Sequence, residues 1–224
     1  MFVKICGTTS EEDALLAVAM GADAIGFIFA PSVRQIAPSL AGDIAKRLPS
    51  EVLTVGVFRD ESPQRVVDIM ESTGLRAAQL HGRETPEQTV WIRRRVRTVI
   101  KVFSAGDATV ADAAAYGADI VMLDSAKTGS TGQVFDWRLA EGVPSGQRLL
   151  LAGGLDADNV ADAIAQVNPW GVDAASHLEA APGKKDPRKL RAFIAAAKGA
   201  ARPAYQGEGS GPYDWQEDLE PWQR

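Results

Sequence analysis

Phe2-Val3-Lys4-Ile5-Cys6 opens the chain, and a similar run, Ile120-Val121-Met122-Leu123-Asp124, lies just past its middle. Each run is short and mostly apolar, and each ends on a side chain that can handle a proton. Such runs are typical of parallel strands covered on both faces. In a barrel of parallel strands, the carboxyl ends of all strands meet at one mouth, where catalysis takes place. The two runs therefore predict a parallel barrel with Cys6 and Asp124 at its mouth.

Strand-like runs of this kind alternate with alanine-rich amphipathic segments along most of the chain. Strands are predicted near Val3–Cys6, Ala24–Phe29, Leu53–Phe58, Ala77–Leu80, Val99–Phe103, Ile120–Leu123, Leu149–Ala152 and Val172–Ala174. Helices are predicted at Glu11–Met20, Ala41–Leu48, Pro63–Ser72, Pro86–Val96, Ala108–Tyr116, Ala157–Val167 and Pro187–Lys198, with a weaker segment at Phe135–Glu141. Ser62, Thr85 and Asp186 each precede a proline, as a cap residue precedes proline at the first helical position.

Strand ends recur about every 20 to 30 residues, which is the size of one βα unit, so about eight units fit. We therefore predict an α/β fold, a single (β/α)8 TIM barrel over residues 1–198. A doubly wound open sheet is the alternative, but Gly7-Thr8-Thr9 is too short for the dinucleotide loop such a sheet usually has. Residues 199–224 contain Gly207–Pro212 and an acidic end, which predict a flexible, poorly structured C-terminal tail.

The composition excludes several classes of partner. The chain has 224 residues, 46% of them hydrophobic, and a net charge of -5, which attracts neither nucleic acid nor an anionic membrane. No apolar run approaches the roughly 18 residues of a membrane span, and no signal-peptide pattern opens the chain. With one cysteine and two histidines, we expect no disulfide and no metal site. We expect a cytoplasmic monomer or homodimer acting on a small molecule.

Cys6 is the first candidate catalytic residue. Taken alone, a buried cysteine is most often a small hydrophobe. Here Gly7 and Thr8 end the strand directly after it, and Lys4, two residues back, lies on the same face. A nearby ammonium lowers the pKa of a thiol and favours the thiolate. We therefore expect a lowered pKa at Cys6.

Three further residues at strand ends are candidates. Asp124 borders an apolar interior, which should raise the pKa of its carboxyl group and suit a general acid; the alternative is a solvated or helix-capping aspartate. Arg34, in the loop after the second strand, can clamp a substrate carboxylate with two hydrogen bonds. His81 ends the fourth strand and either contacts substrate or bonds to its own loop.

Glycine-rich turns gather in the last half of the chain. Gly129 lies in the loop after the sixth strand, Gly153 and Gly154 follow the seventh, and Ser176 and His177 follow the eighth. In this fold, the loops after strands seven and eight usually hold phosphate through backbone N–H groups at the start of a short helix. We predict a phosphate site made by these five residues.

Short motifs add to these single residues, in a fixed order from Val3 to Lys198. They are Lys4-Ile5-Cys6-Gly7, Gly26-Phe27-Ile28-Phe29, Gln79-Leu80-His81-Gly82, Leu123-Asp124-Ser125, Phe135-Asp136-Trp137, Leu151-Ala152-Gly153-Gly154-Leu155, Gly171-Val172-Asp173 and Gly183-Lys184-Lys185-Asp186. Together they resemble the phosphoribosylanthranilate isomerase family of tryptophan biosynthesis. The resemblance implies the Amadori rearrangement of N-(5-phosphoribosyl)anthranilate to 1-(2-carboxyphenylamino)-1-deoxy-D-ribulose 5-phosphate, an aldose–ketose isomerisation that needs no cofactor.

The same resemblance implies a role for each catalytic candidate. The aspartate matching Asp124 protonates the ring oxygen and opens the sugar to a Schiff base, after which the cysteine matching Cys6 removes the C2 proton. Arg34 matches an arginine that contacts the anthranilate. Two positions depart from the family, since His177 and Ser130 stand where it usually has glycine. Histidine tolerates left-handed φ better than most residues, and its ring can add a phosphate donor or narrow the pocket.

Other functions remain open. A dual-specificity aminosugar-phosphate isomerase of the histidine and tryptophan pathways would resemble this barrel, but that group has an aspartate where this chain has Cys6. Indole-glycerol-phosphate synthase would require lysines and a glutamate at strand ends, and Lys101 lies mid-strand. A non-catalytic phosphosugar-binding barrel is suggested by Ser130 and His177, whereas the presence of both Cys6 and Asp124 opposes it.

Overall fold

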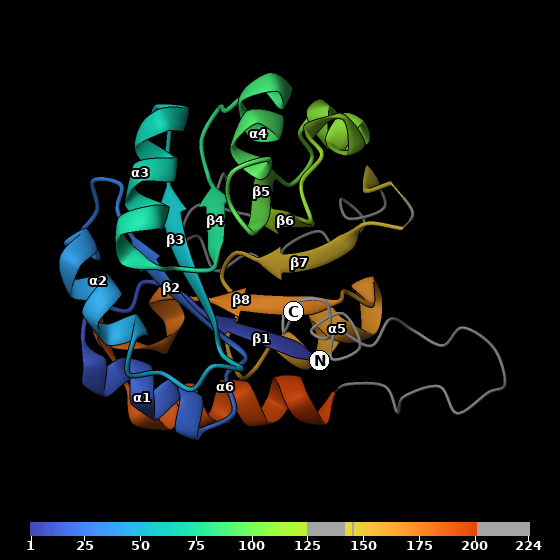
Figure 1. Ribbon diagram of the computed structural model, residues 1–224. Coiled ribbons are helices and arrows are strands. Elements are labelled where there is room, and N and C mark those ends of the chain that lie inside the picture. Colours follow the sequence, from blue (N-terminus) through green and yellow to red (C-terminus); the bar gives the residue numbers. More distant parts are fainter. Residues whose placement is uncertain (125–141, 145, 201–224) are drawn as a thin grey trace, which may run out of the picture.

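The chain folds into a closed barrel of parallel strands that pair in the order of the sequence (Figure 1). A computed structural model describes residues 1–124, 142–144 and 146–200. The barrel strands are β1 (Phe2–Ile5), β2 (Ala24–Ile28), β3 (Leu53–Phe58), β4 (Ala77–Leu80), β5 (Thr98–Ser104), β6 (Ile120–Asp124), β7 (Arg148–Ala152) and β8 (Gly171–Ala174). Because β1 pairs with both β2 and β8, the sheet closes on itself. The predicted (β/α)8 barrel is confirmed, and the doubly wound open sheet is excluded.

Helices cover the outside of the barrel (Figure 1). They are α1 (Glu11–Ala19), α2 (Pro38–Ala45), α3 (Pro63–Thr73), α4 (Pro86–Arg93), the 3-10 helix η1 (Ala108–Tyr116), α5 (Val160–Val167) and α6 (Pro187–Gly199). The side chains of Ser62, Thr85 and Asp186 each accept a hydrogen bond from a backbone N–H in the first turn of the adjoining helix. These contacts satisfy N–H groups that would otherwise have no partner, so the three predicted caps are confirmed.

Four helix predictions need correction. Helix α2 begins and ends three residues earlier than predicted, because Pro38 takes the first helical position, and α4 ends at Arg93, three residues before Val96. Residues 108–116 form a 3-10 helix, where the pattern predicted an α-helix; the Asp107 carboxylate accepts from the N–H of Thr109, only two residues on, and so starts a tighter turn. Helix α5 begins three residues later than predicted, because Asp156 accepts from the N–H groups of Asp158 and Asn159 and holds them in a turn. The segment predicted at residues 135–141 and the C-terminal tail from residue 201 lie outside the described residues.

Two apolar layers lie on either side of the barrel wall. Side chains that alternate along the strands pack either inside the barrel, as Met122 and Ile100 do, or beneath the helices, as Val121 and Leu80 do. Cys6 belongs to the inner layer together with Met122. Asp124, two residues beyond Met122, faces the same way because strand side chains repeat every second residue. Both predicted proton-handling residues therefore face inward at the carboxyl ends of their strands.

A small unit after β8 was not predicted from the sequence. A short 3-10 helix, η3 (Ser176–Leu178), leads into an antiparallel hairpin of β9 (Glu179–Ala181) and β10 (Lys184–Lys185), outside the barrel. Gly183 turns the chain between the two strands with φ 79°. The backbone N–H of Asp186 donates to the carbonyl of Leu178, which closes the hairpin just before α6.

Candidate active site

Cys6 lies directly after β1 and is only 5% exposed to solvent. Its N–H donates to the carbonyl of Ala174, which ties the end of β1 to β8. Lys4, fully buried two residues back, donates from Nζ to Oδ1 of Asp173 at 2.7 Å. A Cβ on Gly26 would lie 2.9 Å from Cys6 Sγ and 3.1 Å from Lys4 Nζ. The thiol, the ammonium and the carboxylate therefore form one buried cluster inside the barrel. The spacing of Lys4 and Cys6 predicted the first two members, but not Asp173.

The expected lowering of the pKa of Cys6 is wrong. Burial is the largest influence and raises the pKa of the thiol; Lys4 lowers it and Asp173 raises it, and the net result is a raised pKa. Burial alone would lower the pKa of Lys4, but Asp173 and Cys6 outweigh it, so the pKa of this ammonium is raised. Lys4 thus lies beside the thiol as expected and lowers its pKa. This effect is smaller than the combined effects of burial and of the Asp173 carboxylate, which both raise the pKa of the thiol.

Asp124, the last residue of β6, lies close to His81, which directly follows β4. The distance between Asp124 Oδ2 and His81 Nε2 is 3.2 Å, and the side chain of Asp124 is 15% exposed. The other ring nitrogen of His81 is 3.5 Å from the amide nitrogen of Gln79. His81 therefore lies between Gln79 of its own segment and Asp124 of β6, and its contact with substrate stays a prediction. The sequence could not show that His81 and Asp124 contact each other.

Arg34 is fixed by an acidic partner that was not predicted from the sequence. Its Nε and Nη2 donate to the two carboxylate oxygens of Glu179, both at 2.8 Å. Burial alone would raise the pKa of Glu179, but Arg34 and Lys185 outweigh it and lower this pKa. The side chain of Arg34 also packs on Gly7, where a Cβ would lie 2.7 Å from Arg34 Cδ. Only glycine fits at this position, because the backbone also has φ 70°.

The loops after β7 and β8 lie side by side, as predicted for the phosphate site. Gly153 and Gly154 have φ values of 100° and 67°, and a Cβ on Gly154 would lie 3.7 Å from the ring of His177. Ser176 and His177 form the start of η3. Among the described non-glycine residues, positive φ occurs at Asp60 and Asn168, so the backbone of His177 is not left-handed. The fifth predicted residue, Gly129, lies outside the described residues.

His177 has an acidic neighbour in the loop after β7. Its Nδ1 lies 3.5 Å from Oδ2 of Asp156, and its side chain is 47% exposed. A cavity of about 600 Å³ opens beside these two residues, towards Ser176 and towards Arg188 and Lys189 in the first turn of α6. The ring of His177 thus lies at the rim of this cavity rather than in the barrel interior.

A buried cation elsewhere in the barrel wall has a structural role. Lys101, mid-strand in β5, donates to the carbonyl of Gly82 at 2.8 Å and to Glu84 at 2.6 Å, and both side chains are almost fully buried. Glu84 in turn accepts from the N–H groups of Asp60 and Gly82. Lys101 is on the same face of β5 as Phe103 of the outer layer, so it lies beneath the helices and outside the barrel interior.

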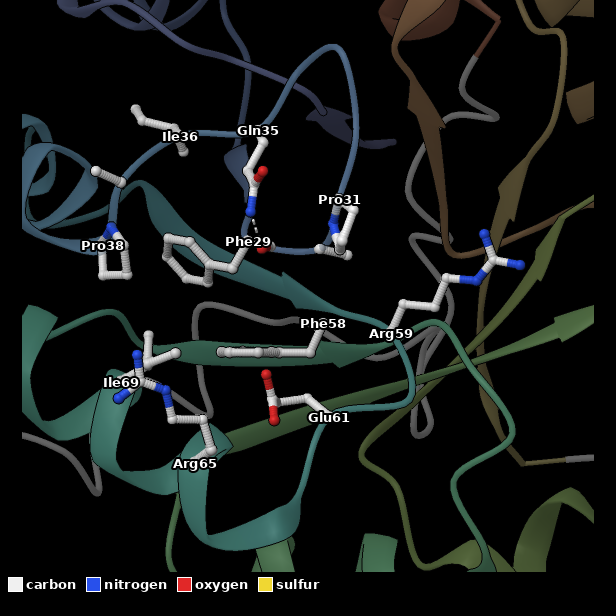
Figure 2. A pocket seen from close by; sticks show the side chains of 12 residues that line it. Phe29, Pro31, Gln35, Ile36, Pro38, Phe58, Arg59, Glu61, Arg65 and Ile69 are labelled. Atoms are coloured by element: carbon white, nitrogen blue, oxygen red, sulfur yellow. Dashed lines mark hydrogen bonds between the residues drawn. The ribbon is translucent and has the colours of Figure 1, made fainter.

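A separate hollow of about 590 Å³ lies outside the barrel wall, between the loops after β2 and β3 (Figure 2). Its floor includes the tilted rings of Phe29 and Phe58, whose centroids are 5.3 Å apart. Glu61 and Arg65 lie along its edge, and Figure 2 shows the side chain of Arg59 pointing away from it. None of the candidate site residues that the structure describes lines this hollow.

The described residues offer no metal centre. Within the parts of the chain at 1–124, 142–144 and 146–200, no group of three or more His, Cys, Asp or Glu side chains is arranged to hold a metal ion. The barrel interior and its mouth combine the thiol of Cys6, the inward-facing carboxyl groups of Asp124 and Asp173, and nearby cations. Such a set can remove one proton from a substrate and donate another.

Comparison with known proteins identifies the family. Residues 3–196 match the family described as N-(5'phosphoribosyl)anthranilate (PRA) isomerase. The N-(5'-phosphoribosyl)anthranilate isomerase of Desulforudis audaxviator is 48% identical over 204 residues, which cover 88% of this chain and 98% of that protein. The crystal structure of phosphoribosyl anthranilate isomerase from Thermus thermophilus is 40% identical, with a TM-score of 0.80 and coverage of 90% of this chain and 100% of that one.

A third relative was solved with a ligand. It is phosphoribosyl anthranilate isomerase in complex with reduced 1-(o-carboxyphenylamino)-1-deoxyribulose 5-phosphate, 38% identical, with a TM-score of 0.77 and coverage of 89% of this chain and 99% of that one. The matches span the whole described barrel and almost the full length of each relative. This chain therefore belongs to the N-(5'-phosphoribosyl)anthranilate isomerase family and is an isomerase of tryptophan biosynthesis.

Proposed function

We propose that the mouth of this barrel isomerises N-(5'-phosphoribosyl)anthranilate, with Cys6 as the general base and Asp124 as the general acid. The observation that carries the proposal is that both side chains face inward at the carboxyl ends of β1 and β6. Active sites of this fold are built at that end of the barrel. A substrate lying across the mouth can therefore contact both groups.

Asp124 is proposed to start the reaction. Its carboxyl group donates a proton to the ring oxygen of the sugar, the bond from C1 to that oxygen breaks, and a Schiff base forms between C1 and the anthranilate nitrogen. His81, whose Nε2 lies 3.2 Å from Oδ2 of Asp124, is proposed to orient the carboxyl group and to line the substrate site. A close partner of this kind can hold an acid group in position for proton transfer.

Cys6 is proposed to complete the reaction. Its thiolate removes the proton from C2, which gives an enolamine; a proton then adds to C1 while the C2 hydroxyl loses its own and becomes a ketone. Substrate and product are isomers, so no electron donor or acceptor is consumed. Because burial raises the pKa of the thiol, the thiolate is a minor form near neutral pH, and the ammonium of Lys4 stabilises it when it forms.

The two ends of the substrate are proposed to bind on opposite sides of Cys6. Glu179 occupies one edge of the Arg34 guanidinium, which leaves the edge between the terminal nitrogens for the anthranilate carboxylate. The phosphate is proposed to bind the backbone N–H groups of the loops after β7 and β8, at Gly153, Gly154, Ser176 and His177. Gly129 stays a prediction for the same site.

The substrate is thus proposed to be a small phosphosugar, and the catalytic domain to be residues 1–198, with 199–224 as a separate tail; helix α6 runs one residue past this boundary, to Gly199. Across the described ranges, no helix is both long enough and apolar enough to span a membrane. We propose a cytoplasmic location and a monomeric or homodimeric enzyme. Sedimentation equilibrium decides between these two oligomeric states.

Steady-state turnover of freshly prepared N-(5'-phosphoribosyl)anthranilate tests the proposal. We expect wild-type turnover, and a loss of several orders of magnitude in kcat for Cys6→Ala and for Asp124→Asn, with thermal unfolding still cooperative in both. Near-normal kcat in either variant would refute its assigned role. Tight binding without turnover would instead identify a phosphosugar-binding barrel, and equal turnover of the histidine-pathway aminosugar phosphate would identify a dual-specificity enzyme.

A further inference from the structure

The hairpin of β9 and β10 joins two residues of the proposed site, although it lies outside the barrel. Glu179, at the start of β9, holds Arg34 through two hydrogen bonds of 2.8 Å. One of the same carboxylate oxygens lies 3.2 Å from Nζ of Lys185 in β10. The side chains of Glu179 and Lys185 are 4% and 0% exposed. Long charged side chains are rarely buried to this extent unless they are paired.

Lys185 connects this pair to the general base. Its Nζ donates to the backbone carbonyl of Cys6 at 2.7 Å and to that of Ala175, just after β8, at 3.1 Å. The backbone N–H of Lys185 donates to Asp13 of α1, which fixes the hairpin against the barrel. The ammonium of Lys185 therefore fixes the backbone of Cys6 relative to the end of β8 and to Glu179.

We propose that Glu179 and Lys185 are positioning residues of the isomerase, which hold the substrate-binding arginine and the catalytic thiol at a fixed separation. The proposal rests on the roles given above to Arg34 and Cys6. Glu179 orients the guanidinium, and Lys185 orients the peptide of Cys6. The hairpin is then part of the active site even though neither residue needs to touch the substrate.

The charges of the cluster support this arrangement. The ammonium of Lys185 lowers the pKa of the Cys6 thiol. Burial lowers the pKa of Lys185 itself, against the opposing effect of Glu179, and Asp13 places a second carboxylate at the backbone N–H of Lys185. From inside the barrel, the paired Lys4 and Asp173 also face the thiol. A cationic neighbour favours the thiolate, so Lys185 contributes to the reactivity of Cys6 as well as to its position.

Substitutions at the two residues have opposite electrostatic effects. Glu179→Gln removes the negative charge, so we expect the Cys6 thiol to titrate at lower pH; Lys185→Met removes a positive charge, so we expect it to titrate at higher pH. Cys6 is the only cysteine of the chain, so the ultraviolet absorbance that the protein gains on titration and that Cys6→Ala lacks reports this thiolate alone, after the tyrosine ionisation common to both is subtracted. This titration requires no substrate.

Kinetics separates the two positioning roles. For Glu179→Gln we expect KM to rise about tenfold, because an amide accepts only one of the two charge-assisted hydrogen bonds from Arg34. Glu179→Asp, which keeps the charge, is expected to recover part of this loss. For Lys185→Met we expect mainly kcat to fall, about tenfold or more, because the peptide of Cys6 loses its anchor.

Glu84→Gln is the matched control, since Glu84 is equally buried and pairs with a buried lysine, Lys101, on the outer side of the barrel. It should lose stability without moving the thiol titration. The proposal is overturned if Glu179→Gln and Lys185→Met shift the titration in the same direction, or no more than Glu84→Gln does. If the titration shifts as expected but the wild type does not turn over substrate, the proposed function fails and the positioning of the thiol stands.

Discussion

Gly26 provides a direct test of how tightly the thiol is held. It lies in β2 beside the end of β1, and a Cβ there would be 2.9 Å from Cys6 Sγ, 3.1 Å from Lys4 Nζ and 3.3 Å from Cys6 Cα. Ordinary contacts begin at 3.4 Å, so Gly26→Ala forces Sγ to move by about 0.5 Å. Lys4 cannot move aside easily, because it is fully buried and bonded to Asp173 at 2.7 Å.

The effect of Gly26→Ala on stability and on rate can be estimated from this geometry. Overpacking a well-packed interior costs about 1–3 kcal/mol of stability. A displacement of about 1 Å at a reacting group can cost about 10²-fold in rate. For the smaller shift of Sγ we expect kcat to fall about tenfold, and the free energy of unfolding to fall by about 2 kcal/mol.

Gly171→Ala is the matched control for Gly26→Ala. Gly171 begins β8 at the opposite end of the barrel, where a Cβ would lie 2.9 Å from the carbonyl oxygen of Phe2 and 3.0 Å from a methyl group of Leu150. Urea unfolding should show a similar loss of stability in both variants, whereas steady-state turnover should show a lower kcat in Gly26→Ala alone. Full kcat in Gly26→Ala, or an equal loss in Gly171→Ala, would refute the placement of the reactive thiol beside Gly26.

Three further predictions concern charge. Lys4→Met is expected to raise the pKa of the Cys6 thiol and Asp173→Asn to lower it, as measured by thiolate absorbance; shifts of the same sign would contradict the cluster. Because burial raises this pKa, kcat/KM of the wild type should increase with pH through the neutral range, and a flat profile would exclude the thiolate as base. Arg34 and Lys185 outweigh burial and lower the pKa of Glu179, so the contribution of this carboxylate to stability is present above pH 4.5 and lost as pH falls below it. The free energy of unfolding in urea should therefore depend less on acid pH in Glu179→Gln than in the wild type. An equal dependence would refute this contribution.

The barrel could be predicted because its signals are local. Each strand is a short apolar run, and the caps at Ser62, Thr85 and Asp186 lie next to the helices that they start. The alternation of side chains along a strand was enough to place Lys4 beside Cys6. Features set by residues close together in the chain could therefore be predicted from the sequence alone.

The partners of the site residues could not be predicted in this way, because they are distant in sequence. Lys4 and Asp173 are 169 residues apart, and Arg34 and Glu179 are 145 apart. The direction of the pKa shift at Cys6 depends on burial of the thiol and on its proximity to Asp173, and both arise only when the barrel closes. Lys185 lies in a run of charged residues that is typical of a solvent-exposed segment, yet its side chain is fully buried.

One signal could have identified the hairpin. Gly183 separates Glu179 and Ala181 from two lysines and an aspartate cap, which is the pattern of a short turn between charged strands. The motif that contains Lys185 was recognised by its resemblance to the family, but its role depends on a hydrogen bond to Cys6 across 179 residues.

A crystal structure of this enzyme with reduced 1-(o-carboxyphenylamino)-1-deoxyribulose 5-phosphate, the ligand of a solved relative, tests the central claim most directly. We predict that Cys6 Sγ and the Asp124 carboxyl group both contact the sugar portion, with the phosphate on the loops after β7 and β8. A ligand that touches only one of these two groups, or binds elsewhere on the barrel, would contradict the proposed mechanism.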